Sequence, residues 1–244
     1  VVYICRKDRT DKEPPALLVK LLGFGALSCL PAIVVELILS AVIERLNVRN
    51  VYLGYFLEAF VVAGLTEETC KFLFLRTTWR NPAFDYQFDA IVYAVMVALG
   101  FAAFENVKYV YSYGFATGIV RAVTAVPGHA IFGVFMGYFY GYAKLSDYWG
   151  RGEDRKAYLA LSVVVPVLLH GCYDFLAFAQ ESDSRFTLLF YAYLIALYVF
   201  GIRRVNRSAR DDRRVTRETV FDYFRRMQYP MPPQYRDRND DFWR

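Results

Sequence analysis

The sequence has little charge, little histidine and no patterned cysteine. Charged residues make up 22% of the 244 residues and hydrophobic residues 56%, with a mean hydropathy of +0.22. This composition excludes disorder for all but the C-terminal tail. It also argues against a soluble globular enzyme, since soluble domains are closer to half apolar. The four cysteines are scattered through apolar stretches, so they form neither a zinc motif nor a disulfide framework.

Other signatures are also missing. The chain contains no HExxH spacing, and it shows no internal repeat of the kind that marks many transporters. A cleaved signal peptide is not visible. The net charge of +5 does not indicate a nucleic-acid partner, because most of the surplus arginine lies in one tail beside an apolar segment. Membrane orientation explains that placement better.

Long apolar runs dominate what is present, and most have the length of about 20 residues that crosses a bilayer core. The sequence therefore predicts an all-α, polytopic transmembrane helical bundle of about six to eight membrane helices, with the lipid bilayer as a partner. Val1–Cys5 is interpreted as the end of a first, truncated membrane helix, and Tyr111–Val126 as a half-helix or re-entrant piece ending at Pro127. The six main runs are Leu17–Ile43, Val51–Leu75, Phe88–Val110, Pro127–Leu145, Leu159–Phe178 and Phe186–Ile202.

Loop charges predict the orientation. With the N-terminal charged stretch in the cytoplasm, alternation places most lysine and arginine on that side, including the arginines that follow Ile202. We expect a transmembrane domain over residues 1–202 and a basic cytoplasmic tail over residues 203–244. Within the tail, Val220, Phe221, Phe224 and Met227 share one face of an expected amphipathic helix. The tail beyond Arg203 is expected to matter for membrane association or regulation and to be dispensable for the activity of the membrane domain.

Ionisable residues inside membrane helices are expensive and are therefore functional candidates. The second run contains Glu67, Glu68 and Lys71. Glu67 and Lys71 are four residues apart, which predicts an ion pair on one helical face. Glu68 points about 100° away, so we expect its carboxylate to be left free for another task. The alternative is that the pair is solvated at the headgroup level.

Both histidines of the chain fall inside apolar runs. His129 begins a row with Gly133, Gly137 and Gly141, and small residues at this spacing let a neighbouring helix approach. His170 precedes Asp174 by one helical turn, a spacing at which a carboxylate orients the ring. The third run adds Glu105 and Asn106 near its outer end. We expect His129, His170, Glu105 and the glutamate pair to converge on one interior cavity.

These motifs together resemble the PrsW family of intramembrane proteases. They are Glu67-Glu68-x-x-Lys71, Phe101-x-x-x-Glu105-Asn106, His129 with its glycines, and His170-x-x-x-Asp174, and a charged Asp8–Pro14 stretch precedes them. The pattern is more distantly similar to the CAAX prenyl proteases and their bacterial relatives. Those carry Arg, His and Asn where this chain has Lys71, Glu105 and Asp174, which favours PrsW.

The resemblance implies cleavage of a single-pass, membrane-anchored protein, such as an anti-sigma factor, in a bacterial cytoplasmic membrane. Peptide hydrolysis needs a base, an oxyanion stabiliser and an acid. Glu67 or Glu68 would activate the water, His170 with Asp174 would polarise the carbonyl or protonate the amine, and His129 or Glu105 would position the water. Lys71 and Asn106 are supporting residues.

Two questions remain open at this stage. Glu68, His129 and His170 would form a zinc site, but we favour glutamate-based catalysis without a metal and commit to no cofactor. A proton-coupled transporter or channel would also place Glu, His and Asp in membrane helices. A non-catalytic scaffold would leave the paired glutamates without a purpose. Glu36 and Glu58 are interpreted as pore-lining or interfacial, and Asp85 and Asp89 as helix-start residues.

Overall fold

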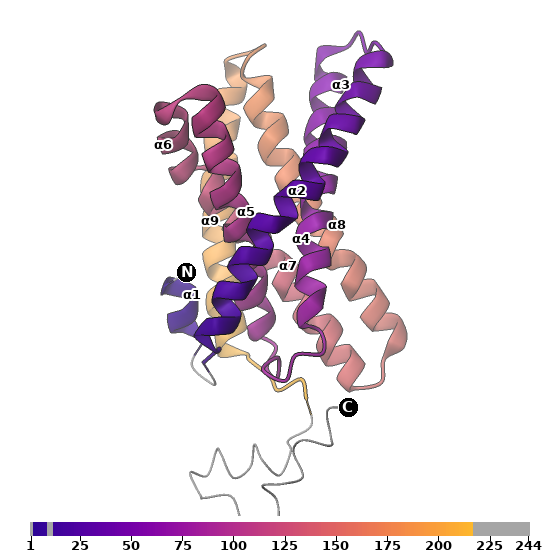
Figure 1. Ribbon diagram of the computed structural model, residues 1–244, viewed down its shortest axis with the longest axis vertical. Helices are drawn as coiled ribbons and strands as arrows, with labels where there is room; N and C mark the ends of the chain where they lie inside the picture. The colour runs from indigo at the N-terminus through magenta and orange to yellow at the C-terminus, as the bar shows by residue number, and fades with distance from the viewer. Residues whose placement is uncertain (1, 9–11, 217–244) are drawn as a thin grey trace, which may run out of the picture.

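The computed structural model describes residues 2–8 and 12–216, and these residues form an all-helical bundle (Figure 1). An isolated bridge between Tyr86 and Arg214 is the only β pairing within them. The predicted amphipathic helix over Val220–Met227 lies outside the described residues, as does part of the Asp8–Pro14 stretch. The elements are α1 (Val2–Lys7), α2 (Pro15–Arg45), α3 (Val51–Phe56), η1 (Leu57–Leu65), α4 (Thr66–Leu75), η2 (Arg76–Thr78), α5 (Asp89–Tyr113), α6 (Phe115–Val123), α7 (Ala125–Tyr148), α8 (Gly152–Ala179) and α9 (Arg185–Arg210).

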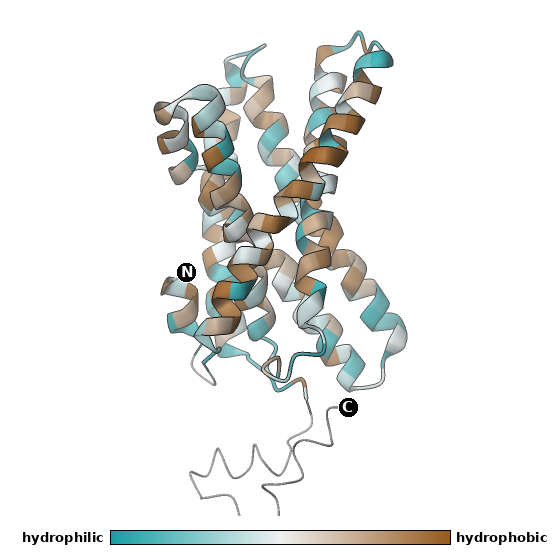
Figure 2. Cartoon of the chain, in the orientation of Figure 1, coloured by the Kyte–Doolittle hydropathy of each residue, from teal (hydrophilic) through white to brown (hydrophobic). Residues whose placement is uncertain are grey.

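The predicted fold class is confirmed. Five helical stretches among the described residues are long and apolar enough to cross a membrane: α2, α5, α6 with α7, α8 and α9. The expected span Val51–Leu75 is continuous helix, but it is divided into α3, the π-helix η1 and α4. Large hydrophobic side chains such as Leu37, Leu188 and Ile195 are exposed on α2 and α9. Hydrophilic residues are frequent at the loops and helix ends (Figure 2).

The segment between α5 and α7 differs in detail from the prediction. The half-helix is present as α6, which begins after Gly114, a glycine with a φ of 90° that few other residues adopt. It does not extend to Pro127. Helix α7 already begins at Ala125, because proline is tolerated in the first turn of a helix, where its missing N–H is not needed.

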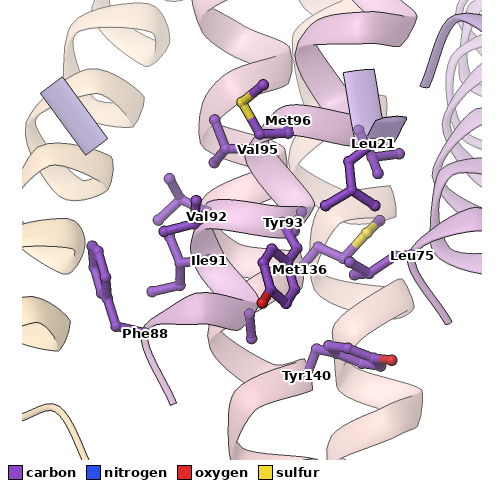
Figure 3. Close-up of a cluster of buried hydrophobic side chains, with 14 of the residues drawn as sticks. Leu21, Leu75, Phe88, Ile91, Val92, Tyr93, Val95, Met96, Met136 and Tyr140 are labelled. Atoms are coloured by element: carbon purple, nitrogen blue, oxygen red, sulfur yellow. The ribbon is translucent and has the colours of Figure 1, made fainter. Parts of the chain in front are cut away.

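Helix α5 is the centre of the bundle. It contacts α2, α4, α6 and α7, and most of its first four turns is buried. Figure 3 shows Ile91, Val92 and Tyr93 of α5 in the main hydrophobic cluster, together with Met136 and Tyr140 of α7. Because this core surrounds α5, the side chains that α5 carries further along are fixed relative to four neighbouring elements.

Glycines permit the close helix crossings on both sides of α5. A Cβ atom on Gly25 of α2 would collide with the backbone carbonyl of Val97, and one on Gly100 would collide with that of Leu22. Gly133 and Gly137 of the row that follows His129 pack in the same way against the α5 backbone, and Gly141 packs against Gln87 just before α5. The row therefore faces a neighbouring helix, as predicted, and aims His129 into the bundle.

The part of the tail that the structure describes is joined to the bundle. Helix α9 continues to Arg210, and Val205 and Val215 are buried in the main core. The backbone N–H of Val215 donates to the carbonyl of Asp85 at 2.8 Å. The expected boundary at residue 203 thus falls inside α9, and a truncation that spares the bundle should begin after Thr216.

Replacing Gly25 with valine is expected to destabilise the protein by about 3 kcal/mol, because the added carbons meet the rigid backbone of α5. Gly23→Val on the same helix is the matched control, since a Cβ there meets no atom within 4 Å. Unfolding in detergent micelles measures both variants. Equal stability of the two would show that α2 and α5 do not cross at this glycine.

Glu13 predicts a pH dependence of stability at the membrane edge. Burial raises the pKa of this carboxyl to about 7, with Asp8 and Asp85 nearby, although the Tyr93 hydroxyl donates a 2.6 Å hydrogen bond to it and Asp89 also hydrogen-bonds it. A raised pKa in the folded state means that folding favours the protonated form. The contribution of Glu13 is therefore complete below about pH 4.5 and is lost as the pH rises through 7. Thermal unfolding from pH 4.5 to 8 should show this loss in the native chain and a flatter profile in Glu13→Gln.

Candidate active site

Lys71 is the hub of a buried polar centre formed by α4, α5, α7 and α8. Its ammonium Nζ lies 2.6 Å from Glu68 Oε1, 3.2 Å from Glu67 Oε2 and 3.0 Å from His129 Nδ1. Lys71 is 1% exposed and Glu68 0%, so the solvated alternative does not hold. The expected Glu67–Lys71 ion pair is present. The expectation that Glu68 is free is wrong. Lys71 follows Glu68 by three residues and Glu67 by four, and its ammonium group contacts both carboxylates.

His129 connects this hub to α5 and α6. Its Nε2 lies 3.0 Å from Glu105 Oε2, and Arg121 of α6 donates to the same oxygen at 2.7 Å. An ammonium group can only donate, so His129 Nδ1 accepts from Lys71 and Nε2 carries the proton that is donated to Glu105. The His129 ring is therefore held with the lone pair of Nδ1 directed at Lys71, the hub of the polar centre.

His170 has a carboxylate at each ring nitrogen. Its Nδ1 lies 2.9 Å from Glu68 Oε1, and its Nε2 lies 3.2 Å from Asp174 Oδ2. The centroids of the His129 and His170 rings are 5.0 Å apart, and the ring of Phe132 stacks on His170. The structure thus brings together the residues that the sequence analysis singled out on four separate helices.

A cavity of about 500 Å³ gives access to one side of the centre. Glu67, Glu105, His129, His170 and Asp174 line it, whereas Glu68 and Lys71 lie behind its wall. It extends towards Glu36, Ser40 and Glu58, at the ends of α2 and η1 that lie far from the arginine-rich end of α9. Figure 1 shows the helices diverging at that end. Glu67 is therefore the glutamate of the pair that a ligand in the cavity could reach.

The local structure before the glutamates helps to aim them. The nine-residue π-helix η1 runs directly into α4, which begins at Thr66. π-Helical turns are rare and occur frequently at functional sites, because the wider turn shifts the direction of every later side chain. A Cβ atom on Gly64, near the end of η1, would lie only 3.2 Å from the Val167 carbonyl oxygen and 3.3 Å from the Gly171 nitrogen, so this glycine lets η1 pack closely against α8.

Sequence reasoning missed Arg121, whereas Glu36 and Glu58, interpreted as pore-lining or interfacial, do line the cavity. Arg121 was not among the residues singled out in the sequence, but its guanidinium lies 3.7 Å from the centroid of the Tyr109 ring and pairs with Glu105 in the cavity wall. The available signal was a single arginine in a short amphipathic segment between two motif-bearing helices. Asn106 is not a cavity residue; its Nδ2 donates to the carbonyl of Gly118 at 3.4 Å and so holds α6 against α5.

The donor set fits a metal ion. Glu67, Glu68, His129 and His170 each offer a ligand atom, and these atoms lie within 4.8 Å of one another. Glu68 Oε2 is buried without a hydrogen-bond partner in the structure. Each histidine turns one nitrogen to the centre and the other to a carboxylate, the arrangement by which metal-binding histidines are oriented. Lys71 opposes a metal, since its ammonium contacts three of the four groups.

Fold and centre together define a polytopic integral membrane protein with a buried acid–base site. Residues 13–202 match the family model described as PrsW family intramembrane metalloprotease. The chain therefore belongs to the PrsW family, and it is an intramembrane peptidase. This membership replaces the transporter alternative and confirms the resemblance carried by the four motifs.

Curated relatives agree over most of their length. The chain is 34% identical to "Protease PrsW" of Oceanobacillus iheyensis over 84% of this chain and 89% of that protein. It is 33% identical to the protein of that name from Bacillus subtilis, over 84% and 88% of the two chains. For the Clostridioides difficile protein the identity is 32% over 87% and 88%. No solved structure matches the chain.

Proposed function

We propose that this chain hydrolyses a peptide bond of a single-pass, membrane-anchored protein, with Glu67 as the residue that activates the attacking water. The observation that supports this role is the position of Glu67, which touches the buried hub through Lys71 and also lines the cavity. A base must reach the water it deprotonates, and Glu68 is sealed behind the cavity wall. Glu68 instead balances the charges of Lys71 and orients His170.

The other groups of the centre complete a hydrolytic set. Lys71 places a positive charge 3.2 Å from the Glu67 carboxylate, a contact that favours the ionised form a base needs. His170, held by Asp174 through Nε2, would donate from Nδ1 to the oxygen of the scissile carbonyl in place of Glu68 as charge develops on that oxygen. Glu67, after taking a proton from water, would deliver it to the leaving amine. His129, fixed by Glu105 and Arg121, would hold the water against Glu67.

A metal has a place in this scheme. Our sequence-based preference for metal-free catalysis is not supported, because the family description names a metalloprotease and the donor set fits. His129 through Nδ1, His170 and Glu68 would hold the ion. A bound zinc ion would lower the pKa of a water molecule and polarise the carbonyl. Glu105 and Asp174 would then orient the two imidazoles from behind.

The substrate and the membrane follow from the same proposal. An anti-sigma-factor-like protein is the substrate class that the family resemblance implies. The arginine-rich end of α9 is placed at the cytoplasmic face of a bacterial membrane, in accordance with the positive-inside rule. The cavity would then open towards the outer face, where the anchored substrate would enter.

Replacing Glu67 with glutamine should lower peptide cleavage roughly 100- to 10,000-fold, since glutamine keeps the shape but cannot accept a proton. Glu68→Gln should also abolish most activity, because Lys71 and His170 lose a common partner. Glu58→Gln is the matched control, as Glu58 lines the same cavity away from the hub. The assay is cleavage of a single-pass protein by purified enzyme in nanodiscs. Full activity in both Glu67→Gln and Glu68→Gln would show that cleavage does not depend on these two glutamates.

Metal content separates the two chemical versions of the proposal. Purified active protein should contain about one zinc ion per chain by elemental analysis, and a strong chelator should remove metal and activity together. Asp174→Asn should weaken zinc binding roughly 10- to 100-fold by releasing His170, whereas Asp183→Asn, at an exposed helix end, should not. Zinc-free protein that cleaves its substrate at the full rate would support catalysis by the glutamates alone.

A further inference from the structure

Two cavities adjoin at the arginine-rich end of α9, and neither shares a lining residue with the cavity of the peptidase centre. The first, of about 520 Å³, is polar. It lies between the start of α5 and the last turns of α9, and Tyr138 and Tyr142 of α7 form part of its wall. The other, of about 500 Å³, is mainly apolar and lies between α7, α8 and α9. Arg204 and Arg207 line both cavities, so the two spaces meet at these side chains.

The polar cavity has the chemistry of an anion site. Four arginines line it against two aspartates, Asp211 and Asp212. The Arg204 guanidinium stacks 4.1 Å above the ring of Tyr138, which fixes its direction, and it forms no ion pair with a carboxylate of the described residues. Ser208 Oγ, in the same wall, is buried without a hydrogen-bond partner in the structure. A buried hydroxyl without a partner is costly, so a ligand that accepts from it is favoured.

The apolar cavity has the chemistry of a hydrocarbon site. Phe135, Leu169, Leu197 and Phe200 line it, on segments of α7, α8 and α9 that qualify as membrane spans. The arginines stand at one end of this groove, at the point where α9 leaves its apolar stretch. An occupant that matches both cavities needs an anionic group at one end and an apolar chain at the other.

We propose that these cavities form a binding site for an anionic phospholipid of the leaflet in which the arginine-rich end lies. Its phosphate would lie between Arg204, Arg207 and Ser208, and one acyl chain would lie in the groove beside Phe200. Basic pockets between membrane helices bind anionic lipid head groups. A free phosphate would leave the groove unused, and a neutral lipid would leave the arginines unused. The proposal does not depend on the peptidase chemistry.

The chain's own residues 217–244 are a less suitable occupant. They follow directly after Thr216, but they contain six arginines and five acidic residues, so they offer no net negative charge to an arginine-lined cavity. A bilayer lipid, in contrast, has both the charge and the apolar length, and it is present around α9 at high concentration in any membrane.

The test measures lipid affinity of the full chain by native mass spectrometry in detergent, with dioleoylphosphatidylglycerol and dioleoylphosphatidylcholine as probes. We expect dioleoylphosphatidylglycerol, which is anionic, to bind more tightly than dioleoylphosphatidylcholine. The double variant Arg204→Gln, Arg207→Gln should weaken its binding roughly 10- to 30-fold, given the usual attraction per basic residue at a membrane surface. Arg151→Gln with Arg155→Gln is the control pair, because these arginines lie at the same end of the bundle but outside both cavities.

A second pair of variants tests the groove without changing the charge. Ala196→Trp should fill the apolar cavity and weaken binding of phosphatidylglycerol, whereas Ala192→Trp, one turn earlier on the exposed surface of α9, should not. Gel filtration and unfolding confirm that each variant is folded. Equal affinity of the native chain and the double arginine variant would overturn the site. Glycerol 3-phosphate binding as tightly as the lipid would show a free-phosphate site, and a rise in lipid affinity on truncation after Thr216 would show that the tail is the occupant.

Discussion

One buried ammonium group, that of Lys71, makes the rest of the centre physically acceptable. Two adjacent glutamates inside a membrane bundle repel each other and lose their hydration, a penalty of several kcal/mol for each ion. Lys71 contacts both carboxylates, and it also donates to His129. The two histidines then each meet a further carboxylate, Glu105 or Asp174. Charge compensation therefore spreads outward from Lys71 and fixes the position of every group that the chemistry needs.

The helices supply the rigidity that this network requires. Glycine contacts bring α2 and α7 against the backbone of α5, and the large hydrophobic cluster locks α5 near its start. Neighbouring residues of an α-helix diverge by about 100°, so α4 directs Glu67 towards the cavity and Glu68 into the protein. The same bundle thereby separates an accessible carboxylate from a structural one, although the two are neighbours in sequence.

Much of this arrangement was readable from spacing, and the remainder depended on contacts that spacing does not encode. The apolar runs predicted the bundle, and the positions of His129, His170 and Asp174 predicted which side chains would meet. The engagement of Glu68 was missed because a lysine at i+3 and i+4 can reach two carboxylates. Arg121 was missed because its partner is set by how α6 folds back on α5. The packing of residues up to Thr216 against the loop before α5 was missed because a basic composition resembles that of a free tail.

A double-mutant cycle between Lys71 and Glu68 tests most directly whether this ion-paired hub holds the site together. Lys71→Met alone leaves two buried carboxylates without their cation, and the account predicts a loss of about 3 to 5 kcal/mol in the free energy of unfolding. Adding Glu68→Gln removes one of those charges, so the double variant should be more stable than Lys71→Met. Unfolding in detergent micelles at neutral pH gives all four values. If the losses in the free energy of unfolding were additive, the double variant would be the least stable of the four proteins. That result would contradict the claim that the ion pairs of Lys71 hold the site together.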